Sequence, residues 1–247
     1  DAPLKRLTLR QDLLGWEAVG RVEVGARGYC TGVLIAADLV LTAAHCLLAD
    51  DGYAPPASLR FRAGLRDGVA LAESRALRTV VHPAYAPHGD AAAHIRHDVG
   101  LMQLATPVPV SMAAPFQAVA LADGAHDLTV VSYGQGRDEA LSWDQRCTML
   151  GRREGLIAFD CDVTFGSSGA PVFRRTGGRG ELVSLVSGGV TDTGERLAFG
   201  MELPRAVADL KAALRRGDGA VAADPAAAGA PGRARHPAPG GAKFVRP

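Results

Sequence analysis

Two adjacent serines, Ser167 and Ser168, stand between glycines in the stretch DCDVTFGSSGAPVF. A serine hydroxyl becomes a useful nucleophile only when a base removes its proton, and histidine is the side chain that most often does so. His45 follows the apolar stretch LVLTAA, and Asp98 stands just before the apolar stretch VGLMQL. Together these residue types could carry out acyl transfer, with the carboxylate fixing the imidazole tautomer.

Each of these residues also has an ordinary structural explanation. A histidine at a strand end can be a satisfied core or edge residue, an aspartate before a strand is commonly a turn residue, and glycine–serine pairs are common in loops. The serines, however, run straight into Pro171, Val172 and Phe173, which a flexible linker would not do. The pattern therefore favours a tightly bent backbone that exposes one hydroxyl.

Short strands are the elements that must position these side chains. From Trp16 to about Met201 the chain consists of apolar or alternating runs of strand length, rich in Val and Leu and bounded by Gly, Asp or Pro. The clearest runs are residues 18–24, 31–36, 39–44, 99–104, 128–134 and 181–190. This spacing predicts an all-β sandwich or barrel.

One helix is predicted late in the chain, in the stretch LPRAVADLKAALRRG. Pro204 suits the first helical position, and Val207, Leu210 and Leu214 form one apolar stripe. Gly217 ends the helix after two arginines that complement its negative end.

Composition excludes several classes of function. The chain has 247 residues, 47% hydrophobic and 21% charged, with a net charge of +1, which suits one or two compact domains and no nucleic-acid or membrane-surface role. No apolar run approaches the roughly 20 residues of a membrane helix. Residues 218–247, mostly Ala, Pro and Gly, predict a disordered tail, and residues 1–15 an N-terminal extension or propeptide remnant. Because the first residue is Asp1, a removed signal peptide would fit.

The cysteines form two close pairs, Cys30 with Cys46 and Cys147 with Cys161. Each pair would close a loop of about 15 residues, where a disulfide stabilises the fold by roughly 3 kcal/mol in the chain-entropy model. Neither pair has the CxxC spacing of a zinc or redox site. Two local disulfides in an exported protein are favoured over four unpaired core thiols.

The combined motifs resemble the chymotrypsin-like serine peptidases, over roughly Trp16 to Gly217. The family's histidine motif, Thr-Ala-Ala-His-Cys, is intact at Thr42–Cys46, and its aspartate motif reads Asp98-Val99-Gly100-Leu101. Its serine motif, Gly-Asp-Ser-Gly-Gly-Pro, reads Gly-Ser-Ser-Gly-Ala-Pro at residues 166–171. The order His, Asp, Ser is also the family's, and Cys30 with Cys46 matches the disulfide that holds its histidine loop.

This resemblance implies an all-β fold of two antiparallel six-stranded β-barrels, residues 16–110 and 111–203, followed by a C-terminal helix at 204–217. It implies a serine endopeptidase that needs no cofactor or metal and acts on proteins or peptides, with neither nucleic acid nor membrane as partner. A monomer, secreted or periplasmic, is expected.

The resemblance also assigns roles to individual residues. Ser168 aligns with the nucleophile, His45 with the general base that later returns the proton, and Asp98 with the residue that orients the imidazole. The backbone N–H groups of Gly166 and Ser168 align with the oxyanion hole. Ser167 occupies the place where trypsin has aspartate.

One departure from the family concerns activation. Trypsin-type enzymes insert a new N-terminus, Ile-Val-Gly-Gly, that pairs with the aspartate before the nucleophile. This chain has no such motif, its nearest stretch being EAVGRVEV, and the partner aspartate is Ser167. We therefore expect a site formed without that switch, as in bacterial relatives of the glutamyl endopeptidases.

Substrate preference stays open at this point. Asp162, six residues before the nucleophile, stands where trypsin-like enzymes keep the aspartate that binds Arg or Lys, but it could equally be a loop residue beside Cys161. Ser187, Gly188 and Gly189 resemble the family's substrate-pairing segment, without the tryptophan usual near Gly188. A glutamyl-type specificity is the alternative, although this segment lacks a histidine to neutralise an acidic side chain.

Two rival interpretations remain. His82, His88, His94 and His97 lie close in sequence with Asp90 among them, and such a set could hold zinc, but the spacing matches no metal template. A non-catalytic binding module on the same fold is the rival function, because a fold by itself does not establish an activity.

Overall fold

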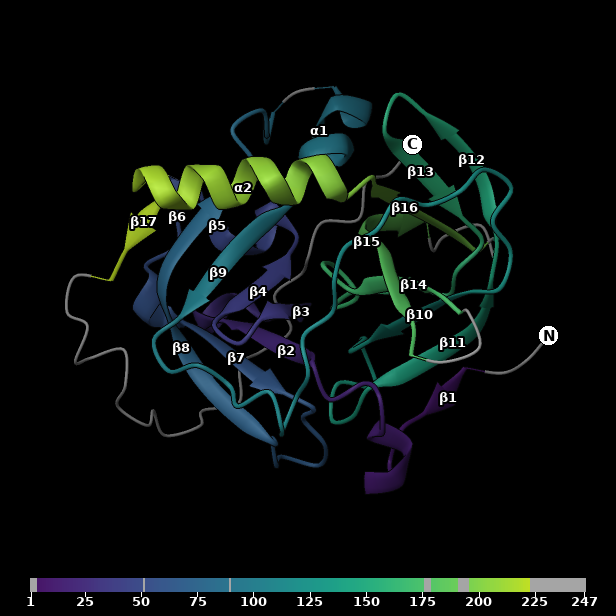
Figure 1. The fold of residues 1–247 in the computed structure, drawn as a ribbon, viewed down its shortest axis with the longest axis horizontal. Helices are drawn as coiled ribbons and strands as arrows, with labels where there is room; N and C mark the ends of the chain where they lie inside the picture. Colours follow the sequence, from purple (N-terminus) through teal and green to yellow (C-terminus); the bar gives the residue numbers. More distant parts are fainter. Residues whose placement is uncertain (1–3, 51, 89, 176–178, 191–195, 223–247) are drawn as a thin grey trace.

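The chain folds into two β-structures that lie side by side, with a long helix across one end of the first (Figure 1). The computed structural model describes residues 4–50, 52–88, 90–175, 179–190 and 196–222. Almost every described strand pairs antiparallel with its neighbours, so the predicted all-β class is confirmed.

Six strands of the first half close into a barrel in the order β8–β7–β2–β3–β4–β9, where pairing of β9 with β8 completes the ring. These strands are β2 (Val19–Val24), β3 (Tyr29–Ala36), β4 (Leu39–Thr42), β7 (Leu59–Ala63), β8 (Ala72–Val81) and β9 (Gly100–Leu104). Strand β7 illustrates the alternation that lets such strands line a core. Leu59 and Phe61 are fully buried, while Arg60 and Arg62 alternate with them toward solvent. A short hairpin, β5 (Leu48–Ala49) with β6 (Gly52–Tyr53), lies beside the barrel.

The second half is an eight-stranded sheet in the order β1–β11–β10–β14–β15–β16–β13–β12. Its strands are β1 (Lys5–Arg6), β10 (Leu128–Ser132), β11 (Ser142–Cys147), β12 (Met149–Arg153), β13 (Leu156–Phe159), β14 (Pro171–Arg174), β15 (Glu181–Val190) and β16 (Leu197–Met201). Within the described residues no pairing joins β1 to β12, so this sheet is a half-barrel where a closed barrel was expected.

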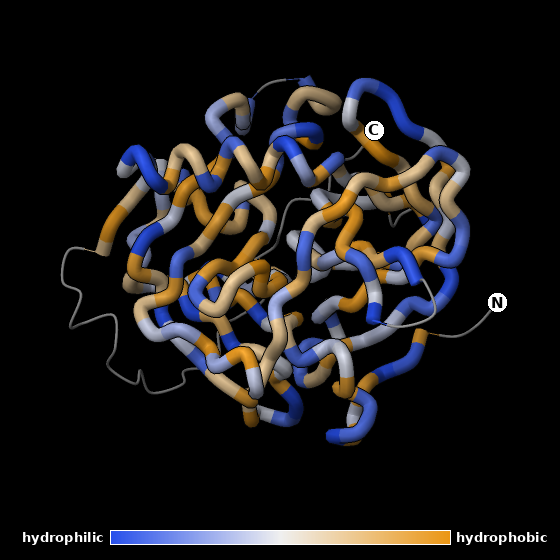
Figure 2. Tube along the Cα trace, viewed as in Figure 1, coloured by the Kyte–Doolittle hydropathy of each residue, from blue (hydrophilic) through white to orange (hydrophobic). Residues whose placement is uncertain are grey.

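Aromatic side chains fill the space between the two halves. The ring of Phe173 on β14 lies 4.5 Å from that of Phe116 and 5.0 Å from that of Trp16, and Trp16 also lies 5.7 Å from Trp143. Such tilted pairs contribute beyond the area they bury. Figure 2 shows hydrophobic residues along the inner strands, with hydrophilic stretches at the periphery, such as the turn between β12 and β13.

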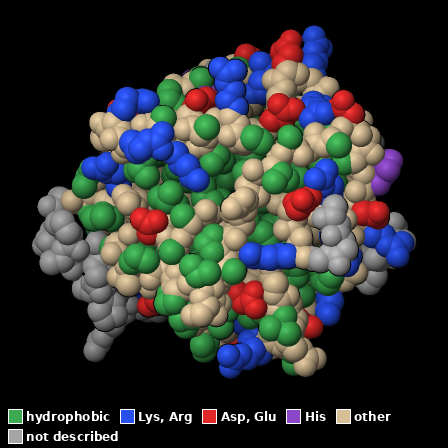
Figure 3. All heavy atoms as spheres, in the orientation of Figure 1, with side chains coloured by type: hydrophobic (Ala, Val, Ile, Leu, Met, Phe, Trp, Pro, Cys, Tyr) green, Lys and Arg blue, Asp and Glu red, His purple; other side chains and the backbone are tan. Residues whose placement is uncertain are grey.

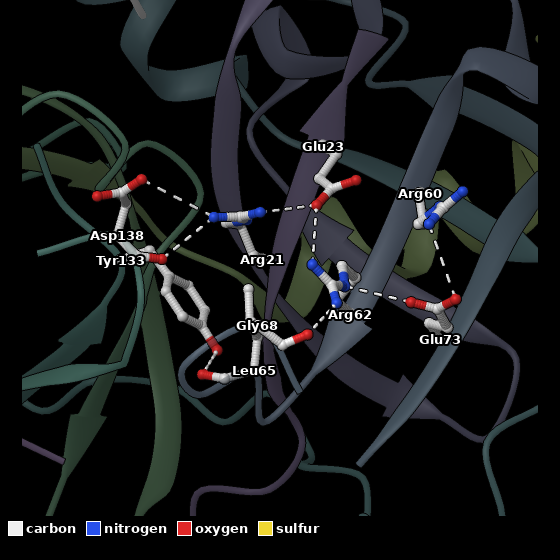
Figure 4. A network of polar contacts seen from close by, with 9 residues as sticks. All are labelled: Arg21, Glu23, Arg60, Arg62, Leu65, Gly68, Glu73, Tyr133 and Asp138. Atoms are coloured by element: carbon white, nitrogen blue, oxygen red, sulfur yellow. Dashed lines mark hydrogen bonds and ion pairs between the residues drawn. The ribbon is translucent and has the colours of Figure 1, made fainter. Parts of the chain in front are cut away.

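A polar network joins the two halves (Figure 4). The Arg21 guanidinium on β2 donates to the Asp138 carbonyl at 3.2 Å and to the Glu23 carboxylate at 2.7 Å. The Tyr133 hydroxyl, from the second half, donates to the Leu65 carbonyl of the first at 2.9 Å. The loop that follows β10 is therefore held against the first barrel.

The helix predicted at the C-terminal end is confirmed as α2 (Pro204–Arg216), which packs on β8 and β9. Pro204 is its first residue, Leu210 is fully buried, and Gly217 ends the helix with a φ of +87° that favours glycine. A second, shorter helix, α1 (Ala91–His97), was not predicted and packs on β13 and β16. Neither helix of the described chain has the length and hydrophobicity that a membrane-crossing helix needs.

Both ends of the chain differ from the sequence-based expectation. The N-terminal segment is part of the fold, because β1 pairs with β11 and Leu7 is buried with its N–H bonded to the Leu141 carbonyl at 2.8 Å. At the other end, β17 (Ala220–Val221) pairs with β8, so the predicted disorder is wrong for residues 218–222. The rest of the predicted tail, 223–247, lies outside the described residues. Both expected disulfides are formed.

Removing the Leu7 side chain tests whether the N-terminal segment belongs to the fold. Leu7 is 0% exposed and Leu9, two residues on, is 55% exposed. Leu7→Ala is therefore expected to lower the free energy of unfolding by about 2–5 kcal/mol, and Leu9→Ala by less than about 0.5 kcal/mol, in urea titrations. Equal stability of the two variants would contradict the packing of this segment.

Candidate active site

His45 lies in a 3₁₀ turn, Ala44–Leu47, that directly follows β4. The turn is tied to β3 by the disulfide between Cys46 and Cys30. The His45 side chain is 19% exposed, so most of its surface is covered. Because this turn directly follows the buried residues of β4, the position of the imidazole is set by the packing of the barrel.

Asp98 stands between α1 and β9 and is 0% exposed. Its Oδ2 lies 2.7 Å from His45 Nδ1, and its Oδ1 accepts the backbone N–H of His45 at 2.9 Å. The Ser187 hydroxyl, from β15 of the second half, donates to Oδ2 at 2.6 Å. The carboxylate thus holds the proton of His45 on Nδ1 and leaves Nε2 as the basic atom.

The electrostatics of this pair follow from the geometry. Burial alone would raise the pKa of Asp98, but the His45 charge and the hydrogen bonds from His45 and Ser187 outweigh it and hold that pKa below its ordinary value. Burial likewise lowers the pKa of His45, and the Asp98 charge and hydrogen bond outweigh it and raise it. The two groups therefore stabilise each other's charged form.

The serine turn lies between Thr164 and β14, packed against the strand that leads to His45. Gly169 has a φ of +76°, and a Cβ there would overlap the Thr42 hydroxyl and the Thr31 carbonyl. Its N–H donates to the Val186 carbonyl at 2.7 Å. Only glycine fits this close approach, which brings the serine turn against the end of β4.

Ser168 is 1% exposed, and its Oγ has no hydrogen-bond partner in the part of the chain that the structure describes. The same is true of His45 Nε2, which is also buried. Buried polar atoms are normally paired, so it is notable that a hydroxyl donor and an imidazole acceptor are both without partners here. In free enzymes the hydrogen bond between nucleophile and base is often long, and it tightens when substrate binds.

The peptide groups around Ser168 have a defined orientation. The Phe165 carbonyl accepts the N–H of Gln135 at 2.7 Å, and the Ser167 carbonyl accepts the N–H of Ala170 at 2.9 Å. In a trans peptide the N–H points opposite to the C=O, so the N–H groups of Gly166 and Ser168 both point away from these donors. Neither N–H makes a hydrogen bond within the described residues.

Ser167 faces the interior of the turn and is 0% exposed. Its hydroxyl donates to the Ser132 hydroxyl at 3.2 Å and accepts the Thr164 N–H at 3.3 Å. Ser167 therefore supports the turn through neutral hydrogen bonds, at the position where trypsin has an aspartate.

Comparison with known proteins identifies the family. Residues 30–183, more than half of the chain, match the model of the trypsin-like peptidase domain. The chain is a trypsin-like serine peptidase. Among curated proteins, its sequence has no significant match.

Solved structures share the fold of this trypsin-like peptidase. They include the thermostable serine protease AL20 from an extremophilic microorganism (22% identical, TM-score 0.66, covering 80% of this chain and 96% of that one). A Glu endopeptidase is 15% identical, with a TM-score of 0.70, covering 86% of this chain and 97% of that one. A mutant of human heparin binding protein is 14% identical, with a TM-score of 0.67, covering 89% and 99%.

The sequence-predicted pocket residues of this peptidase lie in different environments. Asp162 is exposed, and its N–H donates to the Asp144 carboxylate at 2.7 Å, next to the disulfide of Cys161. Asp144 is buried and pairs with Arg196. The predicted substrate-pairing residues, Ser187 to Gly189, are buried on β15. Their role, like that of Asp162, stays a prediction.

Three residues support the site through contacts that had no signal in the sequence. Ser187 was predicted to meet substrate, and its bond to Asp98 was missed. Gln135 supports the Phe165 peptide, and Thr31 donates its N–H to the Ser168 carbonyl at 2.8 Å and its hydroxyl to the Gly166 carbonyl at 2.9 Å. All three join segments far apart in the chain, so no local pattern could reveal them.

The five residues considered for zinc do not converge in the described chain. Asp90 caps α1 by accepting the N–H groups of Ala92 and Ala93, and the ring of His82 stacks on that of His97 at 4.9 Å. Among the described residues, the side chains close enough together to share an ion are those of Cys30, His45 and Cys46, and both cysteines are in a disulfide.

The pH dependence of hydrolysis tests the link between Asp98 and His45. The base must be neutral, so kcat/KM is expected to fall as pH decreases through the pKa of His45, which Asp98 raises above its ordinary value. Asp98→Asn removes the charge that raises this pKa, so the acid limb should move to lower pH while kcat drops by about 10⁴-fold.

A second carboxylate on the same segment provides the control for this pH profile. Asp90→Asn removes an exposed charge and keeps an N-cap on α1. It should leave both the acid limb and kcat in place, as measured from pH 5 to 9. An unshifted acid limb in Asp98→Asn would contradict the assignment.

Proposed function

We propose that this peptidase hydrolyses peptide bonds through an acyl-enzyme intermediate, with Ser168 as nucleophile, His45 as general base and then acid, and Asp98 as the group that orients His45. The observation that carries the proposal is the contact of 2.7 Å between Asp98 Oδ2 and His45 Nδ1, together with His45 Nε2 and Ser168 Oγ, which have no hydrogen-bond partner among the described residues. In this arrangement His45 has its basic atom free for the serine proton.

The proposed oxyanion hole is formed by the N–H groups of Gly166 and Ser168. Support comes from the orientation of both peptide groups and from the absence of other acceptors for these N–H groups within the described residues. Each such donor typically stabilises the transition state by about 3 kcal/mol. A substrate carbonyl held there would place its carbon next to the Ser168 hydroxyl.

Substrate is proposed to be a protein or peptide in extended form, pairing its backbone with Ser187 to Gly189. The chemistry needs no cofactor, and a monomer suffices because the first and second halves together supply all three side chains. Basic side chains gather over α2 in Figure 3, but acidic and apolar side chains lie among them on the rest of this face. We propose that the enzyme is secreted or periplasmic, because disulfides such as its two persist in these oxidising environments.

The competing function is a binding module that has kept the fold without its chemistry. One neighbour in the comparisons is named a heparin binding protein, although at 14% identity the likeness shows the fold alone. The buried Asp98 with its hydrogen-bonded imidazole favours catalysis, because a buried carboxylate is costly to keep without a use.

Replacing each adjacent serine in turn tests the assignment. Ser168→Ala is expected to lower peptide hydrolysis by at least about 10³-fold, because it removes the proposed nucleophile. Ser167→Ala removes two neutral hydrogen bonds and is expected to retain activity within about 10-fold. The measurement is the rate of hydrolysis of a fluorogenic peptide library by purified, folded protein. Activity retained in Ser168→Ala would overturn the proposed mechanism.

Activation is proposed to occur without an N-terminal ion pair. Ser167 is buried and bonded to Ser132, so the turn has no carboxylate for a new N-terminus to meet. An extension fused before Asp1 is therefore expected to leave peptide hydrolysis unchanged. A strict requirement for a free N-terminus would refute this.

We also propose that the enzyme prefers Arg or Lys before the scissile bond. Replacing Asp162 tests this preference. If Asp162 binds the basic side chain, Asp162→Ser should lose cleavage after Arg and Lys selectively in a peptide panel. An unchanged preference would exclude the role, in keeping with the exposure of Asp162. Cleavage after Glu by both proteins would instead support the glutamyl alternative.

A further inference from the structure

The Arg137 side chain is half-buried, and its guanidinium has two buried nitrogen atoms, Nη1 and Nη2, that lack a hydrogen-bond partner among the described residues. Arg21, by contrast, contacts Asp138 and Glu23. A buried guanidinium without partners is destabilising, and an energetic cost of this kind tends to persist where function requires it.

Its position is next to the loop that carries the proposed oxyanion hole. The N–H of Arg137 donates to the Gly134 carbonyl at 2.8 Å, closing a tight turn after β10. A Cβ on Gly134 would lie 2.7 Å from Arg137 Nε and 2.7 Å from Thr164 Cγ2, so the guanidinium lies over Gly134 beside Thr164. Thr164 comes two residues before Gly166.

The same turn also orients the oxyanion loop directly. Gln135, inside the turn, donates its N–H to the Phe165 carbonyl at 2.7 Å, which directs the N–H of Gly166 to the opposite side. The far side of this loop is anchored to the first barrel, since the N–H of Asp67 donates to the Glu139 carbonyl at 2.7 Å. Arg137 thus lies in a turn that is fixed on both sides.

Negative charge around Arg137 is only partly available to neutralise it. The groups that face it are Asp162, Tyr29 and Asp144, while burial lowers the pKa of Arg137. Asp144 is already paired with Arg196, and Asp162 is exposed, where solvent screens its charge. Burial raises the pKa of Tyr29 to about 12, so it stays a neutral phenol. Arg137 therefore keeps, beside Thr164, a positive charge that no carboxylate neutralises through a hydrogen bond within the described residues.

We propose that Arg137 is a positioning residue for the oxyanion hole, and that the positive charge of its unpaired guanidinium favours the anion that forms on the substrate carbonyl. The inference rests on the proposed function. In that step the Ser168 Oγ–carbon bond forms, the hydroxyl proton moves to His45 Nε2, and the carbonyl π electrons move onto oxygen. A fixed cation nearby acts most strongly on this charged state and little on the neutral bound substrate.

The test compares neutral and charged replacements of Arg137. Arg137→Met and Arg137→Gln are expected to lower kcat by about 10- to 100-fold with KM changed less than about twofold. The affinity of a peptide boronic acid, whose tetrahedral adduct is anionic, should fall by the same factor. Arg137→Lys should recover most of the loss. Thermal stability of Arg137→Met should be equal to or above that of the wild type, because two buried, unpaired nitrogen atoms of the guanidinium are removed.

Arg205→Met is the matched control, since Arg205 is 96% exposed on α2 and distant in sequence from the turn. It should change none of these quantities. Unchanged kcat in a folded neutral variant, or a loss confined to KM, would overturn the proposal, as would failure of both neutral variants to fold. Ser168→Ala tests the nucleophile separately, so failure at Arg137 would leave the proposed mechanism standing.

Discussion

The structure depends on one buried carboxylate. Asp98 accepts three hydrogen bonds, two from His45 and one from Ser187, and is 0% exposed. His45 belongs to the first barrel and Ser187 to the second sheet, so the carboxylate is satisfied only when both halves are packed together. Losing a donor would leave a buried charge under-bonded, at a cost comparable to a large share of the stability of a domain. Assembly of the two halves and assembly of the site are therefore the same event.

A second constraint acts on the backbone of the serine turn. Thr31 on β3 donates to the carbonyls of Ser168 and Gly166, and its hydroxyl accepts the N–H of Tyr133 at 3.0 Å. This one side chain of the first barrel thus holds two segments of the second half. Together with the positive φ of Gly169, it orients the turn through neutral hydrogen bonds and close packing. Neutral hydrogen bonds also hold Ser167, the residue before Ser168, to Ser132 and Thr164.

The features that could be predicted from the sequence are those whose pattern lies within one short segment. The histidine, aspartate and serine motifs are short, and helix α2 has a proline, an apolar stripe and a terminal glycine within its own length. Strand β1 is two exposed basic residues without periodicity, so its pairing with β11 depends on tertiary contacts alone. The bonds of Ser187, Gln135 and Thr31 likewise join distant segments. The exposure of Asp162 and the half-burial of Arg137 are equally properties of the assembled fold.

The central claim is that packing of the two halves, with no further event, produces an activated nucleophile at Ser168. Incubating the intact protein with a fluorophosphonate, and mapping the adduct by peptide mass spectrometry, tests it most directly. The expected result is one adduct per chain on Ser168, absent in His45→Ala, because the hydroxyl reacts only when the imidazole removes its proton. Folded wild-type protein that takes up no label, or takes it up on Ser167, would contradict the claim.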